Sequence, residues 1–184
     1  MRAAIGFSVH TGWAAAVAVG GPRATVLARQ RVVLADSDYG RFVYHAARET
    51  PAFGKEMVKE SRQVAVRRGA RALKDLVAEL GDHDLVAIAL PPAKRALPPL
   101  EKILASHTLV HSAEGELFRA ALVTAGEKLG LAVVELAPAE IPALSVDGPP
   151  WGKDQRTAAA LAWAALRRRS RPARPPTGID RRRR

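Results

Sequence analysis

The apolar residues in the first part of the chain fall into three strand-length runs. Ala3–Val9 and Trp13–Val19 flank the segment His10-Thr11-Gly12, and a third run, Ala24–Leu34, follows Gly20-Gly21-Pro22. Turn-forming residues between strand-length apolar runs are typical of β-hairpins. We therefore predict three strands that pair as an antiparallel sheet and that later elements cover.

Apolar spacing farther along predicts helices that alternate with two more strands. A short helix over residues 39–49 precedes a long helix over 55–80, and Leu85–Leu90 is a continuous apolar run typical of a strand buried on both faces. The remaining elements are a short helix, a helix capped by Ser112, a second apolar strand and an alanine-rich helix, over residues 97–105, 112–129, 131–136 and 153–169. Both late strands are expected to be interior and parallel, which gives a mixed α/β sheet covered by helices.

The net charge of +11 is concentrated in the last residues. Residues 167–184 hold nine of the 29 Lys and Arg residues and one of the 18 acidic residues, so the remainder carries only +3. Prolines and like charges in this segment disfavour folding. We expect one domain over residues 1–169, with 48% apolar residues in the chain to fill its core, and a disordered basic tail over 170–184.

Composition argues against several classes of protein. The chain has no cysteine, so it forms neither disulfides nor thiolate metal sites. No apolar run reaches the roughly 18 to 20 residues of a membrane span, and polar residues interrupt the first run, unlike the core of a secretory signal. We expect a cytoplasmic protein without membrane association.

Basic residues gather in two places, which favours nucleic acid as the partner. The candidate phosphate-binding residues are Lys59, Arg62, Arg67, Arg68, Arg71, Arg167, Arg168, Arg169, Arg171 and Arg174. Arginines on an extended tail have no fixed groove to enter, so binding should be independent of base sequence. The same residues also fit a solvated helix face and a tail that contacts acidic proteins. Whether the nucleic acid is DNA or RNA, and whether the chain is a homodimer, stays open.

Histidines provide one candidate ligand group. His107 and His111 are four residues apart, which places them on one face, and together with His10 they could form an imidazole metal site. Isolated surface histidines are the commoner arrangement. We expect no resident metal or cofactor.

The order of elements resembles the ribonuclease-H-like fold, and in particular the RuvC-type Holliday-junction resolvases and the YqgF-type rRNA-maturation nucleases. Residues 5–14, IGFSVHTGWA, are similar to the first hairpin of these families, and residues 85–90 to their fourth strand. Residues 114–135 resemble the helix and strand that follow, and residues 151–162 the last helix. The resemblance covers residues 2–166 as a pattern, and it implies metal-dependent nuclease chemistry on nucleic acid.

The resemblance also implies where catalytic carboxylates would hold two divalent metals: on the first strand, near the end of the fourth strand and on the last helix. In this chain those positions are Ser8, Ala89, Arg156 and Ala159. A hydroxyl and a methyl group cannot replace anionic ligands, and an arginine repels a divalent cation. We therefore favour a catalytically degenerate, nucleic-acid-associated protein that is not an enzyme.

Two alternatives stay open. Asp154, Glu114 and Glu116 lie in the predicted first turns of two helices, and they would form a relocated catalytic cluster for a nuclease using Mg²⁺ or Mn²⁺ if those helix ends converge. If the ends do not converge, the same acids simply complement the helix dipoles. The other alternative is a non-enzymatic protein-interaction module.

Overall fold

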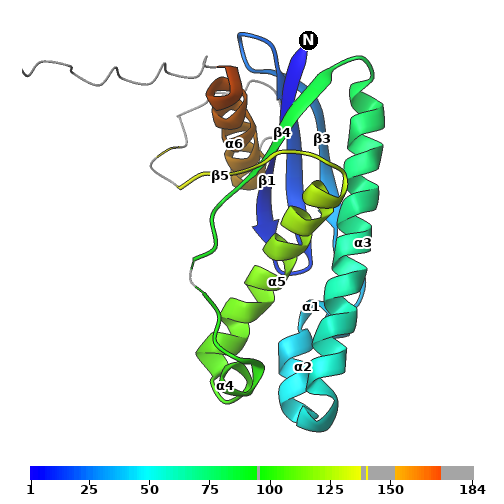
Figure 1. Cartoon of the computed structure of the whole chain (residues 1–184), viewed down its shortest axis with the longest axis vertical. Coiled ribbons are helices and arrows are strands. Elements are labelled where there is room, and N and C mark those ends of the chain that lie inside the picture. Colours follow the sequence, from blue (N-terminus) through cyan, green and yellow to red (C-terminus); the bar gives the residue numbers. More distant parts are fainter. Residues whose placement is uncertain (95, 138–139, 141–151, 171–184) are drawn as a thin grey trace, which may run out of the picture.

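The protein is a five-stranded mixed sheet between two layers of helices, as seen in a computed structural model (Figure 1) that describes residues 1–94, 96–137, 140 and 152–170. The strands, in chain order, are β1 Arg2–His10, β2 Trp13–Gly20, β3 Thr25–Val33, β4 Asp84–Leu90 and β5 Val133–Glu135. Their order in the sheet is β3-β2-β1-β4-β5, with β1–β2 and β2–β3 antiparallel and β1–β4 and β4–β5 parallel. The predicted α/β mixed sheet of three antiparallel and two parallel strands is confirmed.

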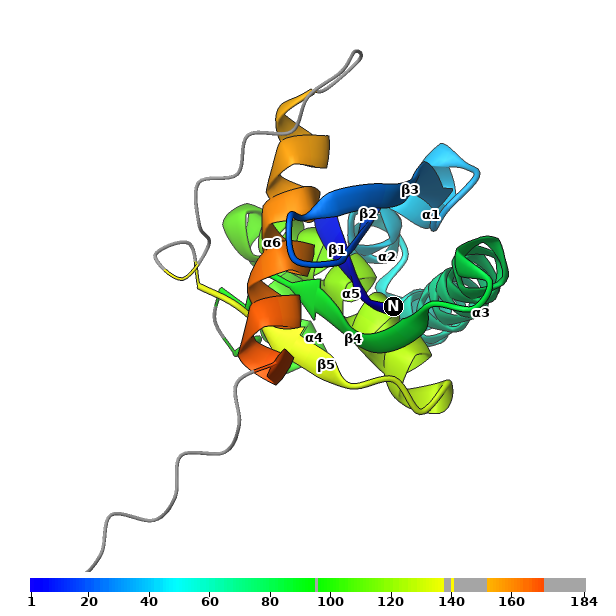
Figure 2. The same ribbon diagram turned by 90° about the horizontal axis from the view of Figure 1, so that it is seen from above.

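The helices lie on both faces of this sheet. They are α1 Asp38–Arg41, α2 Val43–Glu49, α3 Gly54–Leu80, α4 Leu100–Leu104, α5 His107–Lys128 and α6 Lys153–Ser170, with a 3₁₀ turn, η1, at Pro51–Phe53. Figure 2 shows α6 on one face and α3 and α5 on the other. The single helix predicted over residues 39–49 is two helices, because the backbone leaves the helical conformation at Phe42.

The last strand differs from its prediction, because β5 lies at the edge of the sheet and pairs only with β4. The side chains of β5 and of the residue after it nevertheless pack against apolar residues on both faces of the sheet. Val133 packs into the core below α3 and α5, whereas Val134 and Leu136 pack into the core below α6. Two helical layers that extend over an edge strand thus produce the continuous apolar run that is typical of an interior strand.

Helix α5 begins six residues earlier than the predicted cap at Ser112 implies. Ser106, not Ser112, is the N-cap, and its hydroxyl accepts a hydrogen bond from the backbone N–H of Leu109 at 3.4 Å. The hydroxyl of Ser112 instead donates to the carbonyl of Thr108 within the helix. As a result Glu114 is not in the first turn, and its side chain is buried rather than placed at the helix end.

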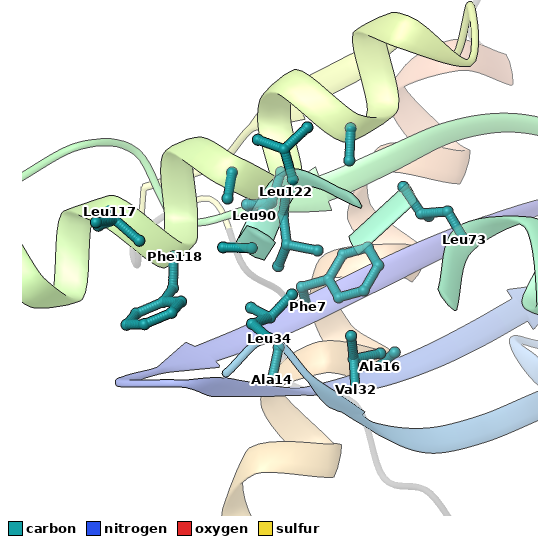
Figure 3. Packing of buried hydrophobic residues seen from close by; sticks show 14 of the residues in the cluster. Phe7, Ala14, Ala16, Val32, Leu34, Leu73, Leu90, Leu117, Phe118 and Leu122 are labelled. Carbon is teal, nitrogen blue, oxygen red and sulfur yellow. The ribbon is translucent and has the colours of Figure 1, made fainter. Parts of the chain in front are cut away.

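Side chains of β1 alternate between the two cores. Ile5 and Phe7 belong to the larger core under α3 and α5, where Figure 3 shows Phe7 among Leu73, Leu122 and other apolar side chains. Ala4 belongs to the core under α6, as the two-residue period of a strand requires.

Gly6 sets how closely α6 approaches the sheet. A Cβ atom at this position would lie only 1.9 Å from the carbonyl oxygen of Ala158. The helix backbone therefore rests directly on β1. Asp154 precedes Ala158 by one helical turn, and Ser8 follows Gly6 on the same face of the strand, so this close contact brings Asp154 to Ser8.

Among the described residues, no helix has the length and the apolar character needed to cross a membrane. The basic tail predicted over residues 170–184 falls almost wholly on residues 171–184, which lie outside the described part of the chain.

Candidate functional site

The N-terminal turn of α6 meets the end of β1 in a small polar site. The hydroxyl of Ser8 donates a hydrogen bond to Oδ1 of Asp154 at 3.2 Å. Nε2 of His10 lies 2.9 Å from the same oxygen. Ser8 is nearly buried, whereas the side chains of His10 and Asp154 are 39% and 37% exposed, so solvent reaches the carboxylate.

The ring of His10 stacks face to face on the ring of Trp13, the first residue of β2. The two rings stack with centroids 4.3 Å apart and planes only 10° from parallel. The guanidinium of Arg31 lies 3.6 Å from the centroid of Trp13, in cation–π contact. The tight β1–β2 turn makes His10 and Trp13 cross-strand partners, a pairing that the sequence analysis did not predict.

The other positions matched to family carboxylates carry no acid. Ala89 on β4 pairs with Gly6 and is fully buried in the core under α6, and Ala159 is fully buried in the same core. Arg156 is exposed in the first turns of α6. Both alanines take part in the packing of α6 on the sheet.

Glu114 and Glu116 have partners other than Asp154. Glu114 is 1% exposed, and its Oε1 accepts a hydrogen bond from the backbone N–H of His45 at 3.3 Å and contacts Nδ1 of that ring at 2.8 Å. Glu116 accepts from Arg119, which also donates to Glu135 on β5. The three acids that were candidates for one catalytic cluster therefore have three different sets of partners.

Two pKa values respond to these surroundings. Hydrogen bonding to Glu116 raises the pKa of Arg119. Burial of the guanidinium lowers this pKa, and the hydrogen bond to Glu135 raises it further. Burial raises the pKa of Tyr44, which precedes His45 on α2; Glu114 and Glu116 add to the increase, and Arg62 opposes it.

A cleft of about 620 Å³ lies beyond the ends of β1 and β4. Its walls combine the chain after β4 with one side of α5, and they are Val9, Pro91, Pro92, Lys94, Leu97, His111, Ser112, Gly115, Glu116 and Arg119. Ligands of open α/β sheets bind beyond the carboxyl ends of the strands, so this position favours ligand binding. A second cleft, of about 750 Å³, lies around Arg2, Trp163 and Arg168, and none of Ser8, His10 and Asp154 lines either cleft.

Most of the predicted phosphate-binding residues of α3 are accessible to a ligand. Lys59, Arg62, Arg67 and Arg71 are exposed, whereas Arg68 pairs with Asp36. Arg167 and Arg168 are exposed near the end of α6, with Arg168 3.5 Å from Glu140. The side chain of Arg169, and all of Arg171 and Arg174, lie outside the described residues.

The third histidine near His107 and His111 is His45, not His10. One ring nitrogen from each of His45, His107 and His111 lies within 4.8 Å of the others. The sequence prediction named the wrong partner because His10 sits on the opposite face of the sheet, against Asp154. His45 is 62 positions before His107, and only the packing of α2 against α5 brings the rings together.

The fold is that of the ribonuclease-H-like proteins, and the predicted resemblance is confirmed at this level. The chain is similar to Thermus thermophilus RuvC in complex with a Holliday junction substrate, with a TM-score of 0.58 and 14% sequence identity over 92% of this chain and 96% of that one. A second structure of Thermus thermophilus RuvC gives a TM-score of 0.53 and 14% identity over 91% of this chain and 96% of that chain. No protein-family model and no curated protein matches the sequence.

Proposed function

We propose that this protein associates with nucleic acid by means of its ribonuclease-H-like fold and does not use two-metal cleavage. One observation carries the proposal. Asp154, the acid next to Ser8, belongs to no group of three or more carboxylate and imidazole side chains with converging ligand atoms among the described residues. Its oxygen is instead engaged by Ser8 and His10.

Two divalent metals that activate water and stabilise a leaving oxygen need several anionic oxygen ligands around a small volume. One carboxylate and one neutral hydroxyl supply too few. Ala89 and Ala159 contribute only methyl groups, and the positive charge of Arg156 in the same turn region opposes a cation. The site chemistry therefore supports a binding protein in preference to a nuclease.

Exposed cations support nucleic acid as the partner. Between residues 59 and 71, α3 carries five basic residues and one acid, and four of the basic side chains are exposed. Such a surface binds the phosphate backbone through counterion release. Thermus thermophilus RuvC, which has this fold, has been seen with a Holliday junction substrate.

The relocated-acid nuclease is the second candidate, because Asp154 does lie beside Ser8 on the sheet face under α6. Incubation of the full chain with Mg²⁺ or Mn²⁺ and a four-way junction, a single strand or RNA separates the two proposals. We expect no cleavage above that of Asp154→Asn. Metal-dependent cleavage that disappears in Asp154→Asn and persists in Asp75→Asn, an exposed acid on α3, would show that the protein is a nuclease.

Binding is tested with two variants that lose the same charge. One replaces the exposed cations of α3, Lys59, Arg62, Arg67 and Arg71, by Gln. The other replaces four exposed cations elsewhere, Arg23, Arg48, Lys102 and Lys128, by Gln. We expect the wild-type protein to bind duplex DNA without sequence preference. In a plot of log affinity against log salt concentration, the first variant should lose more of the slope than the second, up to about 0.9 for each phosphate that it no longer neutralises.

Equal losses in the two variants would show that net charge, and not the surface of α3, attracts the nucleic acid. Absence of binding by the wild-type chain at about 50 mM salt, where electrostatic affinity is strong, would exclude the nucleic-acid proposal and favour a protein-interaction module.

A further inference from the structure

Three of the five histidines form a compact cluster between α2 and α5. The ring centroids of His107 and His111 are 4.5 Å apart, and that of His45 is 5.5 Å and 4.8 Å from them. Nε2 of His107 lies 3.1 Å from Nε2 of His111. Because these two residues occupy positions i and i+4 in the first turns of α5, the helix itself presents both nitrogens side by side.

The spacing of these nitrogens suits a small divalent cation. Zinc binds imidazole nitrogen at about 2.0 to 2.1 Å, so two ligands of a tetrahedral site lie roughly 3.3 Å apart. The observed 3.1 Å between the two Nε2 atoms is close to that value. The nitrogen of His45 is within 4.8 Å of them, a separation that a rotation of exposed rings can shorten.

Glu114 fixes the orientation of the third ring. Its carboxylate contacts Nδ1 of His45 at 2.8 Å and also accepts from the backbone N–H of His45, so it holds the imidazole at two points. With Nδ1 bound to a carboxylate, the lone pair available to a ligand is on Nε2. A carboxylate behind a ligating histidine is the usual outer partner of a metal-binding imidazole.

Glu114 also supplies charge complementarity for a cation. Its side chain is 1% exposed and its carboxylate contacts the ring of His45, so it partly compensates the charge of a divalent ion bound by the three imidazoles.

We propose that His45, His107 and His111 bind one divalent transition metal of the zinc class and that Glu114 positions the ring of His45. Imidazole ligands favour Zn²⁺, Cu²⁺, Ni²⁺ and Co²⁺ over Mg²⁺ and Ca²⁺, which prefer oxygen. The site is separate from Ser8 and Asp154, which lie under α6 on the other face of the sheet.

Three protein ligands leave a fourth coordination position open. His111 also lines the cleft of about 620 Å³ beyond β1 and β4, together with Lys94 and Arg119. One ligand of the proposed site, His111, therefore lies at the edge of this cleft.

The experiment uses the full chain without any added histidine tag. Zn²⁺ affinity is measured by competition with a chromophoric chelator, and geometry is measured from the absorption bands of bound Co²⁺. We expect one equivalent of metal, with the band intensity of four-coordinate cobalt. His107→Gln and His111→Gln, both at exposed positions, should lose this binding, and Glu114→Gln should weaken it about 10- to 100-fold.

His10→Gln and His83→Gln are the matched controls, because each removes a histidine outside the cluster. Both should retain one equivalent with unchanged affinity. Zn²⁺ should also raise the Tm of the wild-type chain but not that of His107→Gln, which provides a readout independent of the chelator. Failure of the wild-type chain to bind one equivalent, or equal loss in His83→Gln, would overturn the proposal. Unchanged affinity in Glu114→Gln, with its fold intact, would remove Glu114 from it.

Discussion

A single missing side chain, at Gly6, determines where the polar site under α6 can form. The carbonyl of Ala158 and the backbone nitrogen of Ala162 occupy the space that a Cβ would need. Only glycine lets the helix backbone come this close to the strand. Ser8 and Asp154 meet because this contact fixes the height of the helix above β1.

We expect Gly6→Ala to destabilise the protein by about 1–3 kcal/mol or more, because its methyl group would force α6 away from β1. Gly115→Ala is the matched control, since a Cβ there meets nothing within 4 Å. Because residue 115 lies in the interior of α5, Gly115→Ala should stabilise the protein by about 0.5–1 kcal/mol. Denaturant unfolding measures both changes. Gly6→Ala with wild-type stability would show that α6 is not fixed by this contact.

Burial of Tyr44 predicts a loss of stability at alkaline pH. Its folded-state pKa is raised above the ordinary value of about 10, so the unfolded chain releases the phenolic proton first. The contribution of Tyr44 to stability is therefore complete below about pH 10 and decreases as the pH rises toward the folded-state pKa. Tyr44→Phe should lose less stability above this pH than the wild-type chain, and the exposed Tyr39→Phe should behave like wild type.

At the level of elements, the sequence predicted what depends on local periodicity and missed what depends on packing between distant segments. The β1–β2 hairpin, α3 and α6 were found within one or two residues, because each has strong apolar spacing or clear turn residues. The start of α5 was misplaced because Ser106 and Ser112 are equally suitable caps by residue type. His45 was missed because nothing near it in the sequence indicates that α2 packs against α5.

The edge position of β5 was also not predictable, because its apolar pattern reflects two helical layers and not two neighbouring strands. The candidate site was likewise predicted only in part. The residues that the predicted resemblance matches to the family carboxylates follow from the order of elements, and their replacement of those carboxylates stays a prediction. The contact of Asp154 with Ser8 and His10 depends on how closely α6 packs on the sheet, which no local sequence pattern indicates.

Arg119 connects the short edge strand to α5. Its side chain is 15% exposed and donates to Glu116 on α5 and to Glu135 on β5. We expect Arg119→Met to destabilise the protein by about 1–3 kcal/mol, because hydrogen bonds between charged groups are lost and Glu116 keeps a half-buried charge. Hydrogen exchange should accelerate at Leu136, whose N–H bonds to Leu90 across this edge.

Arg41→Met is the control for Arg119→Met, because Arg41 forms a 3.5 Å pair with Asp38, whose side chain is 88% exposed. Pairs of that kind contribute about 0–1 kcal/mol. Equal effects of the two substitutions would mean that Arg119 does not hold β5 in place.

For the whole molecule, charge is distributed between a nearly neutral body and a strongly basic end. Deletion of residues 170–184 removes Arg171 and Arg174 together with the terminal arginines. We expect this deletion to reduce both the affinity for duplex DNA and the salt slope, by about 0.9 for each phosphate that the tail neutralises. The remaining body should keep the binding that α3 provides. Titrations at several salt concentrations measure the slope, and an unchanged slope would show that the tail does not contact the phosphates.

The position of α6 also sets the order in which the protein can be completed during synthesis. Ser8 and Asp154 are 146 residues apart, and among the described helices only α6 covers the face of the sheet that carries Ala4 and Gly6. At about 5 to 20 residues per second, the ribosome needs roughly 7 to 30 seconds to deliver α6 after β1. Throughout this interval none of the described helices covers the apolar face of the sheet. The yield of native protein therefore depends on how well other chains are kept from that face until α6 arrives.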